Sequence, residues 1–158
     1  MARTAVGKRI KTFYFDVQKA LAWDATEYNF YPADSRTMQE DIRIVGVSMS
    51  CTAGLNVTAI GSIADGAVHT HGELSRHGER GKPSSILDVN VQLYTGVGTS
   101  ENFFGNNMGR DSIMFPDGHG VDLDEGEVLY LHAGCFSNAS GAGEHEHSVF
   151  CLVYYVER

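Results

Sequence analysis

The chain has 158 residues, a formal net charge of −8 at pH 7 and a sequence pI near 5.2. This length fits one domain that buries roughly two thirds of its unfolded surface around a single core. The acidic balance would repel a phosphate backbone over most of the surface, so direct nucleic-acid binding is not expected.

The cysteine pattern and the apolar runs exclude further classes of protein. Cys51, Cys135 and Cys151 are odd in number, widely spaced and set among apolar residues, which is typical of small buried hydrophobes in a reducing compartment. No run of about 18 uncharged apolar residues occurs, and no apolar segment follows the basic N-terminus. We therefore expect neither a membrane span nor a signal peptide.

Basic residues gather at the N-terminus. The first acidic residue, Asp16, comes after four of them, Arg3, Lys8, Arg9 and Lys11. Between Asp111 and Glu157, in contrast, no lysine or arginine occurs. Oppositely charged ends could steer subunits together, although a solvated arm explains the same pattern. We expect a single domain over residues 1–158, with residues 1–9 as its basic arm.

Alternation of apolar and polar residues dominates the sequence and predicts β-strands. It is clearest in LNVTAIGSI, residues 55–63. The expected strands, in chain order, are 10–17, 41–51, 55–63, 67–74, 87–94, 121–124, 127–136 and 148–156, with a further candidate at 26–31. Helical composition occurs only at 16–23, which is too short and uncapped to stand alone.

Long connections separate some of these strands and indicate how the sheets are joined. Residues 95–111 and 137–146 are expected to be loops, and another connection leads to the strand at 41. Long crossovers favour a two-sheet jelly roll over an up-and-down barrel. An immunoglobulin-like sandwich fits less well, because no Cys…Trp…Cys order surrounds Trp23. We predict an all-β, single-domain jelly-roll sandwich of about eight strands.

The last expected strand is apolar on both faces. One face carries Val149, Cys151, Val153 and Tyr155, and the other carries Phe150, Leu152, Tyr154 and Val156. Two explanations are open: a central strand covered on both sides, or a strand with one face in a subunit contact.

The segment HTHGELSRHGERG, residues 69–81, holds three of the seven histidines and is the strongest candidate for chemistry. His-x-His on a strand places two imidazoles on one face, as a metal site requires. The preceding Asp65-Gly66 pair predicts a two-residue type I′ hairpin, which would pair Ser62 with His69 and Val57 with Leu74.

This hairpin register decides which side chains face the core. It directs Val68, Thr70 and Leu74 inward, and His69, His71 and Glu73 outward. Residues 75–81, with His77, would form a charged loop. An outer face lacks the enclosed recess of a metalloenzyme site, so no metal ligand is assigned, although surface chelation by His69 and His71 stays open.

Three other groups could carry chemistry. His145 and His147 alternate with Glu144 and Glu146, and a solvated loop-to-strand junction or a surface metal site would explain them. His132 lies between apolar residues, which indicates a hydrogen-bonded, partly buried histidine. The acidic stretch 122–127 offers oxygen ligands for calcium, but Gly126 comes one place too early for an EF-hand loop, and a solvated turn is the simpler interpretation.

Catalytic motifs are missing from the sequence. It contains no Gly-x-Ser-x-Gly elbow, no Walker loop and no Gly-x-Gly-x-x-Gly. The chain resembles cupin enzymes only in fold class: after His71 the next glutamates are Glu73 and Glu79, which do not match the cupin spacing, and in FPDGHG the histidine, His119, follows Gly118 directly. We assign no catalytic, cofactor-binding or metal-binding residue.

The C-terminal segment 115–158 is similar in pattern to the second half of single jelly-roll virion proteins. It has a Pro-Gly turn, an acidic short strand, a Gly-Glu-x-Leu-Tyr-Leu strand, a small-residue loop and a hydrophobic final strand. Receptor-binding trimers of the tumour-necrosis-factor and C1q type share this organisation, but they are secreted.

The resemblance implies a protein without an active site, made in the host cytoplasm and located in the virion as a capsid, decoration or fibre subunit. Its partners would be copies of itself, as a trimer or higher oligomer, and other capsid proteins. Residues 95–111, 137–147 and the N-terminal arm would lie at the contacts. The alternatives are a cupin-like metal-dependent enzyme and a jelly-roll module that binds a ligand or carbohydrate.

Overall fold

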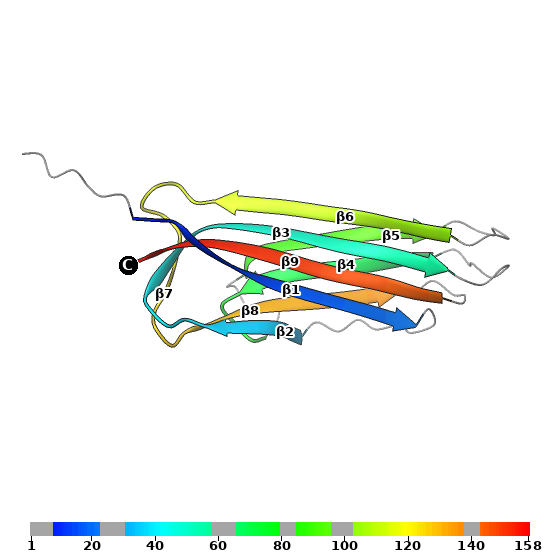
Figure 1. Cartoon of the computed structure of the whole chain (residues 1–158), viewed down its shortest axis with the longest axis horizontal. Coiled ribbons are helices and arrows are strands. Elements are labelled where there is room, and N and C mark those ends of the chain that lie inside the picture. The colour runs from blue at the N-terminus through cyan, green and yellow to red at the C-terminus, as the bar shows by residue number, and fades with distance from the viewer. Residues whose placement is uncertain (1–7, 23–30, 58–65, 80–84, 96–102, 138–142) are drawn as a thin grey trace, which may run out of the picture.

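The computed structural model describes residues 8–22, 31–57, 66–79, 85–95, 103–137 and 143–158 (Figure 1). These ranges contain strands and no helix. The strands are β1 (Lys11–Ala22), β2 (Tyr31–Thr37), β3 (Ile42–Val57), β4 (Gly66–Ser75), β5 (Ser85–Thr95), β6 (Phe103–Met114), β7 (Val121–Leu123), β8 (Val128–Ser137) and β9 (Gly143–Glu157). Within the described residues, no helix long and apolar enough to cross a membrane is found.

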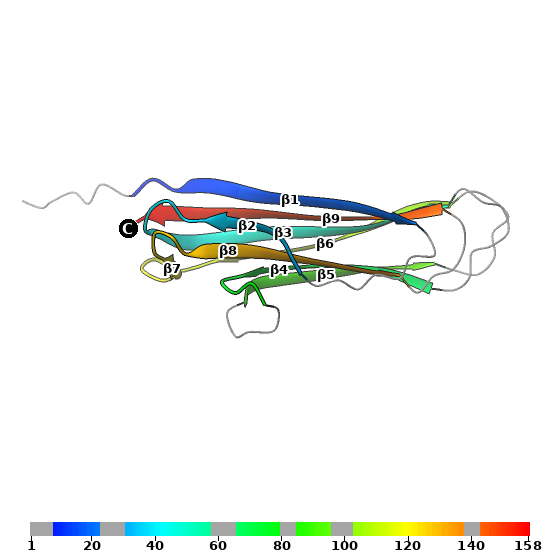
Figure 2. The same cartoon turned by 90° about the horizontal axis from the view of Figure 1, so that it is seen from below.

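The strands form two antiparallel sheets that lie face to face (Figures 1 and 2). The five-stranded sheet has the order β1-β9-β3-β6, with β7 paired to one end of β3, and the four-stranded sheet has the order β2-β8-β4-β5. The pairs β1–β9, β2–β8, β3–β6 and β4–β5 correspond to one long hairpin rolled over on itself. This is the jelly-roll arrangement, as the sequence predicted.

The core lies between the two sheets, where their inward apolar side chains meet. Its largest fully buried side chains are Ile42, Ile44, Val47, Met49, Leu74, Leu123, Leu129 and Leu131. The three cysteines are free and buried in the same layer, as expected, and burial raises the pKa of Cys51 and of Cys151 to about 12. A thiol with such a pKa is inert at neutral pH.

Two expected loops are wrong where the structure describes them. Residues 103–111 belong to β6, and residues 143–146 belong to β9. The stretch GNNMGRDS in β6 lacks the β-branched and aromatic residues that mark strands, and pairing with β3 along its whole length overrides that weak propensity.

Other boundaries also differ from expectation. β3 runs unbroken to Val57, where two strands at 41–51 and 55–63 were expected, and residues beyond 57 lie outside the described part. β1 continues to Ala22 through the segment of helical composition. β2 was not predicted, apart from its first residue in the 26–31 candidate, because YPADSRT has the composition of a turn. Pro32 is tolerated in this strand because it lies on the edge of the sheet beside a bulge.

The predicted pairing of β3 with β4 is wrong. These strands lie in different sheets: Val57 pairs with Phe103 and Gly143, whereas Leu74 pairs with Leu87 and Leu131. The expected turn residues 58–65 lie outside the described ranges. The predicted inward face of β4 is nevertheless confirmed, with Val68, Thr70 and Leu74 at most 1% exposed. Side chains alternate along a strand whatever its partner is.

Candidate functional site

His69 and His71 lie on the outer face of the four-stranded sheet, as predicted. His69 Nε2 accepts a hydrogen bond of 2.6 Å from the Gln92 amide, and burial lowers the pKa of His69 below its ordinary value. His71 Nε2 lies 3.6 Å from a carboxylate oxygen of Asp88 on β5. Both imidazoles therefore have partners on β5, and they do not point toward a common interior centre.

The next residues on this face are covered by the segment that follows β4. Glu73 and His132 are cross-strand neighbours and are 6% and 0% exposed. His132 Nε2 donates a 2.7 Å hydrogen bond to the carbonyl of His77, and Gly78 packs beside the Tyr130 ring. The predicted hydrogen-bonded state of His132 is confirmed, but its burial is complete rather than partial.

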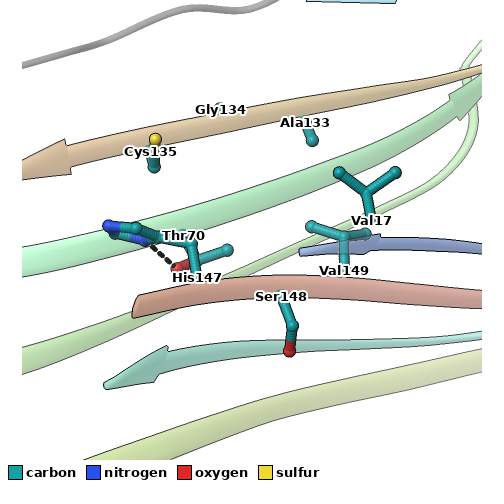
Figure 3. A pocket seen from close by; sticks show the side chains of 8 residues that line it. All are labelled: Val17, Thr70, Ala133, Gly134, Cys135, His147, Ser148 and Val149. Atoms are coloured by element: carbon teal, nitrogen blue, oxygen red, sulfur yellow. Dashed lines mark hydrogen bonds between the residues drawn. The ribbon is translucent and has the colours of Figure 1, made fainter. Parts of the chain in front are cut away.

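His147 lies in the core, so its expected place at a solvated loop-to-strand junction is wrong. Its Nδ1 atom lies 2.6 Å from Thr70 Oγ1 (Figure 3). Because that hydroxyl donates its proton to the Thr52 carbonyl at 2.9 Å, it accepts from His147, which fixes the proton on Nδ1. The adjoining cavity, lined by Val17 and Cys135 among others, has a volume of about 30 Å³, enough for one water molecule.

The acidic stretch 122–127 is engaged in ion pairs. Asp122 accepts two hydrogen bonds from Arg43, at 2.6 and 2.9 Å, and Glu127 accepts one of 2.8 Å from Arg76. Asp124 pairs with Arg158. Among the described residues, no group of three His, Cys, Asp or Glu side chains is placed to hold a metal ion.

These ion pairs predict loss of stability in acid. The hydrogen bond from Arg43 holds the pKa of Asp122 below its ordinary value. A lowered folded-state pKa stabilises the fold above the unfolded-state value, about pH 4, and this contribution is lost as the pH falls further. When thermal unfolding is measured between pH 6 and 2, the melting temperature of Asp122→Asn should fall less with decreasing pH than that of the wild type. Asp117→Asn, which changes an exposed carboxylate outside these ion pairs, is the control and should show the same dependence of melting temperature on pH as the wild type. The same pH dependence in all three proteins would contradict this prediction.

A larger pocket, of about 380 Å³, lies at the end of the sandwich where β9 ends. Its lining is mostly apolar and includes Ile10, Met114, Phe115 and Val156, with Lys8 and His119 among the polar groups. The volume falls within the range used by small ligands.

The outer face of the five-stranded sheet carries exposed apolar side chains. Among the described residues, the large hydrophobic side chains that are exposed all lie on this sheet or directly before β1: Ile10, Tyr14, Met108, Met114 and Phe150. The rings of Tyr14 and Phe150 stack with centroids 5.8 Å apart, at exposures of 64% and 40%. β9 is therefore a central strand, as the first explanation expected, but its outer face is exposed rather than covered; a subunit contact on that face stays a prediction.

Part of this surface could not be assigned from the sequence. The double apolar pattern of β9 indicated Phe150 and Leu152, whereas Met108 and Arg110 fell in an expected loop. Their position on the outer face follows from Gly109, which faces inward: a Cβ atom there would lie 2.7 Å from the Asn90 carbonyl oxygen of the other sheet.

Comparison with solved structures returns viral proteins. The fold is similar to that of a chain in the structure of infectious bursal disease virus Gt strain, with a TM-score of 0.36 and 10% identity over 96% of this chain and 34% of that chain. It is likewise similar to a chain in the structure of the Gx strain, with a TM-score of 0.38 and 10% identity over 94% of this chain and 38% of that chain. It is also similar to the decameric BFDV capsid protein, with a TM-score of 0.36 and 12% identity over 95% of this chain and 100% of that chain. The chain thus spans little more than a third of the bursal disease virus chains. No family model and no curated protein matches.

Proposed function

We propose that the chain is a non-enzymatic structural subunit of a virion, in a capsid, decoration layer or fibre, and acts by self-association into a homo-oligomer. The observation that carries this proposal is the gathering of exposed apolar side chains on one face of the five-stranded sheet. Exposed apolar side chains that gather on one face of a sheet are typical of an interaction surface.

Two further observations support a virion role. The strand order is that of jelly rolls, which build viral capsids as well as lectins and cupins. The C-terminal pattern resembles single jelly-roll virion proteins. In this proposal the protein is made in the host cytoplasm, other capsid proteins contact its surface, and nucleic acid does not.

The metalloenzyme alternative requires histidines that converge in a recess, whereas His69 and His71 lie on the outer face and pair with β5 residues. Metal analysis of the purified protein tests it directly. A stoichiometric transition metal that is lost in the His69→Ala/His71→Ala variant would contradict the structural role.

Light scattering combined with negative-stain imaging tests self-association. We expect particles with a mass several times the 17.2 kDa of one chain, at both low and moderate salt. A strict monomer at high concentration in both buffers would overturn the proposal.

A second candidate function, small-ligand binding, is favoured only by the pocket of about 380 Å³ beside Phe115. Saturation-transfer NMR with simple sugars and short carboxylates tests it. Binding that is lost in Phe115→Ser would support it, and no transfer from any of these probes would count against it.

A further inference from the structure

Four strands of the five-stranded sheet lie side by side in the order β1, β9, β3 and β6 (Figure 1). Their pairing arranges the outward side chains in rows across these strands. One row is Asp16, Phe150, Ser50 and Arg110. The neighbouring row is Tyr14, Leu152, Ser48 and Ser112. Side chains in such rows share one face of the sheet.

These rows divide the face into a raised half and a low half. On β1 and β9 the outward residues are large, and we call Tyr14, Phe150 and Leu152 the ridge. On β3 and β6 these two rows carry serines apart from Arg110, and we call Ser48, Ser50 and Ser112 the furrow. The large outward side chains of β6, Met108 and Met114, lie one row beyond the furrow on either side. The ridge and the furrow lie side by side along the strands, so the face carries both halves of a complementary surface.

Charges of opposite sign occupy the two ends of the first row. Asp16 is on the edge strand beside the ridge, and Arg110 is on the edge strand beside the furrow. Three strand spacings, about 14 Å, separate them, too far for a pair within one chain. Both are exposed, and among the described residues neither has a partner of opposite charge: Asp16 accepts from the Gln18 amide at 3.5 Å, and Arg110 lies 3.7 Å from Met108 Sδ.

We propose that two copies pack face to face through this sheet, related by a two-fold axis parallel to the strands between β9 and β3. This inference rests on the proposed self-association and names one of its contacts. The rotation places β1 over β6 of the second copy and β9 over its β3. Each ridge then lies over the other copy's furrow, as a self-complementary two-fold interface requires.

The same rotation brings the charges together. Asp16 of each copy faces Arg110 of the other, which makes two ion pairs at the edges of the contact. A two-fold axis perpendicular to the strands at this row would instead place Asp16 over Asp16 and ridge over ridge. Like charges in contact across an interface oppose association, so the parallel axis is favoured.

Reciprocal charge reversal tests this arrangement by sedimentation velocity and native mass spectrometry. Asp16→Arg alone and Arg110→Asp alone should each weaken association about tenfold or more, because each variant confronts two like-charge contacts. An equimolar mixture of the two variants should associate again, since every substituted site then faces an opposite charge. The double variant D16R/R110D should also associate. Asp88→Arg, on the outer face of the other sheet, is the matched control and should behave like the wild type.

The outcomes separate this inference from the proposed function. If the wild-type protein is a monomer, self-association itself is overturned. If the wild type associates and both single variants associate equally well, the proposed function stands and the contact lies elsewhere. If the single variants dissociate but neither their mixture nor the double variant associates, the reciprocal pairing of Asp16 with Arg110 is wrong.

Discussion

Replacement of Gly72 by alanine is expected to lower the free energy of unfolding by about 1–3 kcal/mol. Gly72 lies on β4 and faces the other sheet. A Cβ atom at this position would lie 2.5 Å from Val149 Cγ1 and 2.9 Å from Met49 Sδ. Val149 and Met49 belong to the middle strands of the opposite sheet, so an added methyl group would have to displace these buried side chains or push the layers apart.

Urea denaturation monitored by circular dichroism measures this effect, and Gly78→Ala is the matched control. A Cβ atom at Gly78 would lie 3.5 Å from the Tyr130 ring, an ordinary contact distance. The control should unfold close to the wild-type midpoint, because it adds a methyl group without overlap. If Gly72→Ala were as stable as the control, the close approach of the sheets at β4 would be wrong.

Strands with strong alternation were predictable from the sequence, because a strand that buries one face needs an apolar residue at every second position. β5 and β8 lie within two residues of their expected bounds, with Val89, Val91, Leu129 and Leu131 buried as alternation requires. The jelly roll followed from such strands together with long crossovers. β2 and β6 could not be found in this way, because edge strands are held by backbone pairing and tolerate residues such as Pro32 and Gly109.

Strand partners were not predictable, because pairing depends on contacts between distant parts of the chain. The Asp65-Gly66 signal indicated a local hairpin, yet β4 pairs with β5 and β8. The candidate surface has the same limitation. Phe150 and Leu152 were visible in the double apolar pattern of β9, but their rows with Ser50 and Arg110 exist only through the register of β3 and β6.

The outer faces of the two sheets differ in how their polar groups are used. On the four-stranded sheet, His69 and His132 have hydrogen-bond partners within the chain, and Glu73 is buried. On the five-stranded sheet, aromatic rings face outward together with Asp16 and Arg110, which have no oppositely charged partner in the part of the chain that the structure describes. This asymmetry supports the proposal that copies of the chain associate through the five-stranded sheet rather than through the histidine face.

Removal of the Thr70 hydroxyl is also expected to lower the free energy of unfolding substantially. Thr70→Val keeps the shape of the side chain but leaves two groups without this partner, the part-buried Thr52 carbonyl and the buried His147 Nδ1–H. A buried polar group that loses its partner costs about 1–3 kcal/mol. We expect a loss of that size in the free energy of unfolding, measured by urea denaturation at pH 7.

A double-mutant cycle shows whether this loss arises from the bond to His147. His147→Leu removes the imidazole and should also destabilise the core. If the bond stabilises the fold, the Thr70→Val/His147→Leu variant should lose less free energy of unfolding than the sum of the two single variants. The difference should be about 0.5–3 kcal/mol, because the double variant no longer contains a buried imidazole without its partner. Strictly additive losses would show that the two side chains act independently, and that His147 is held in the core by packing alone.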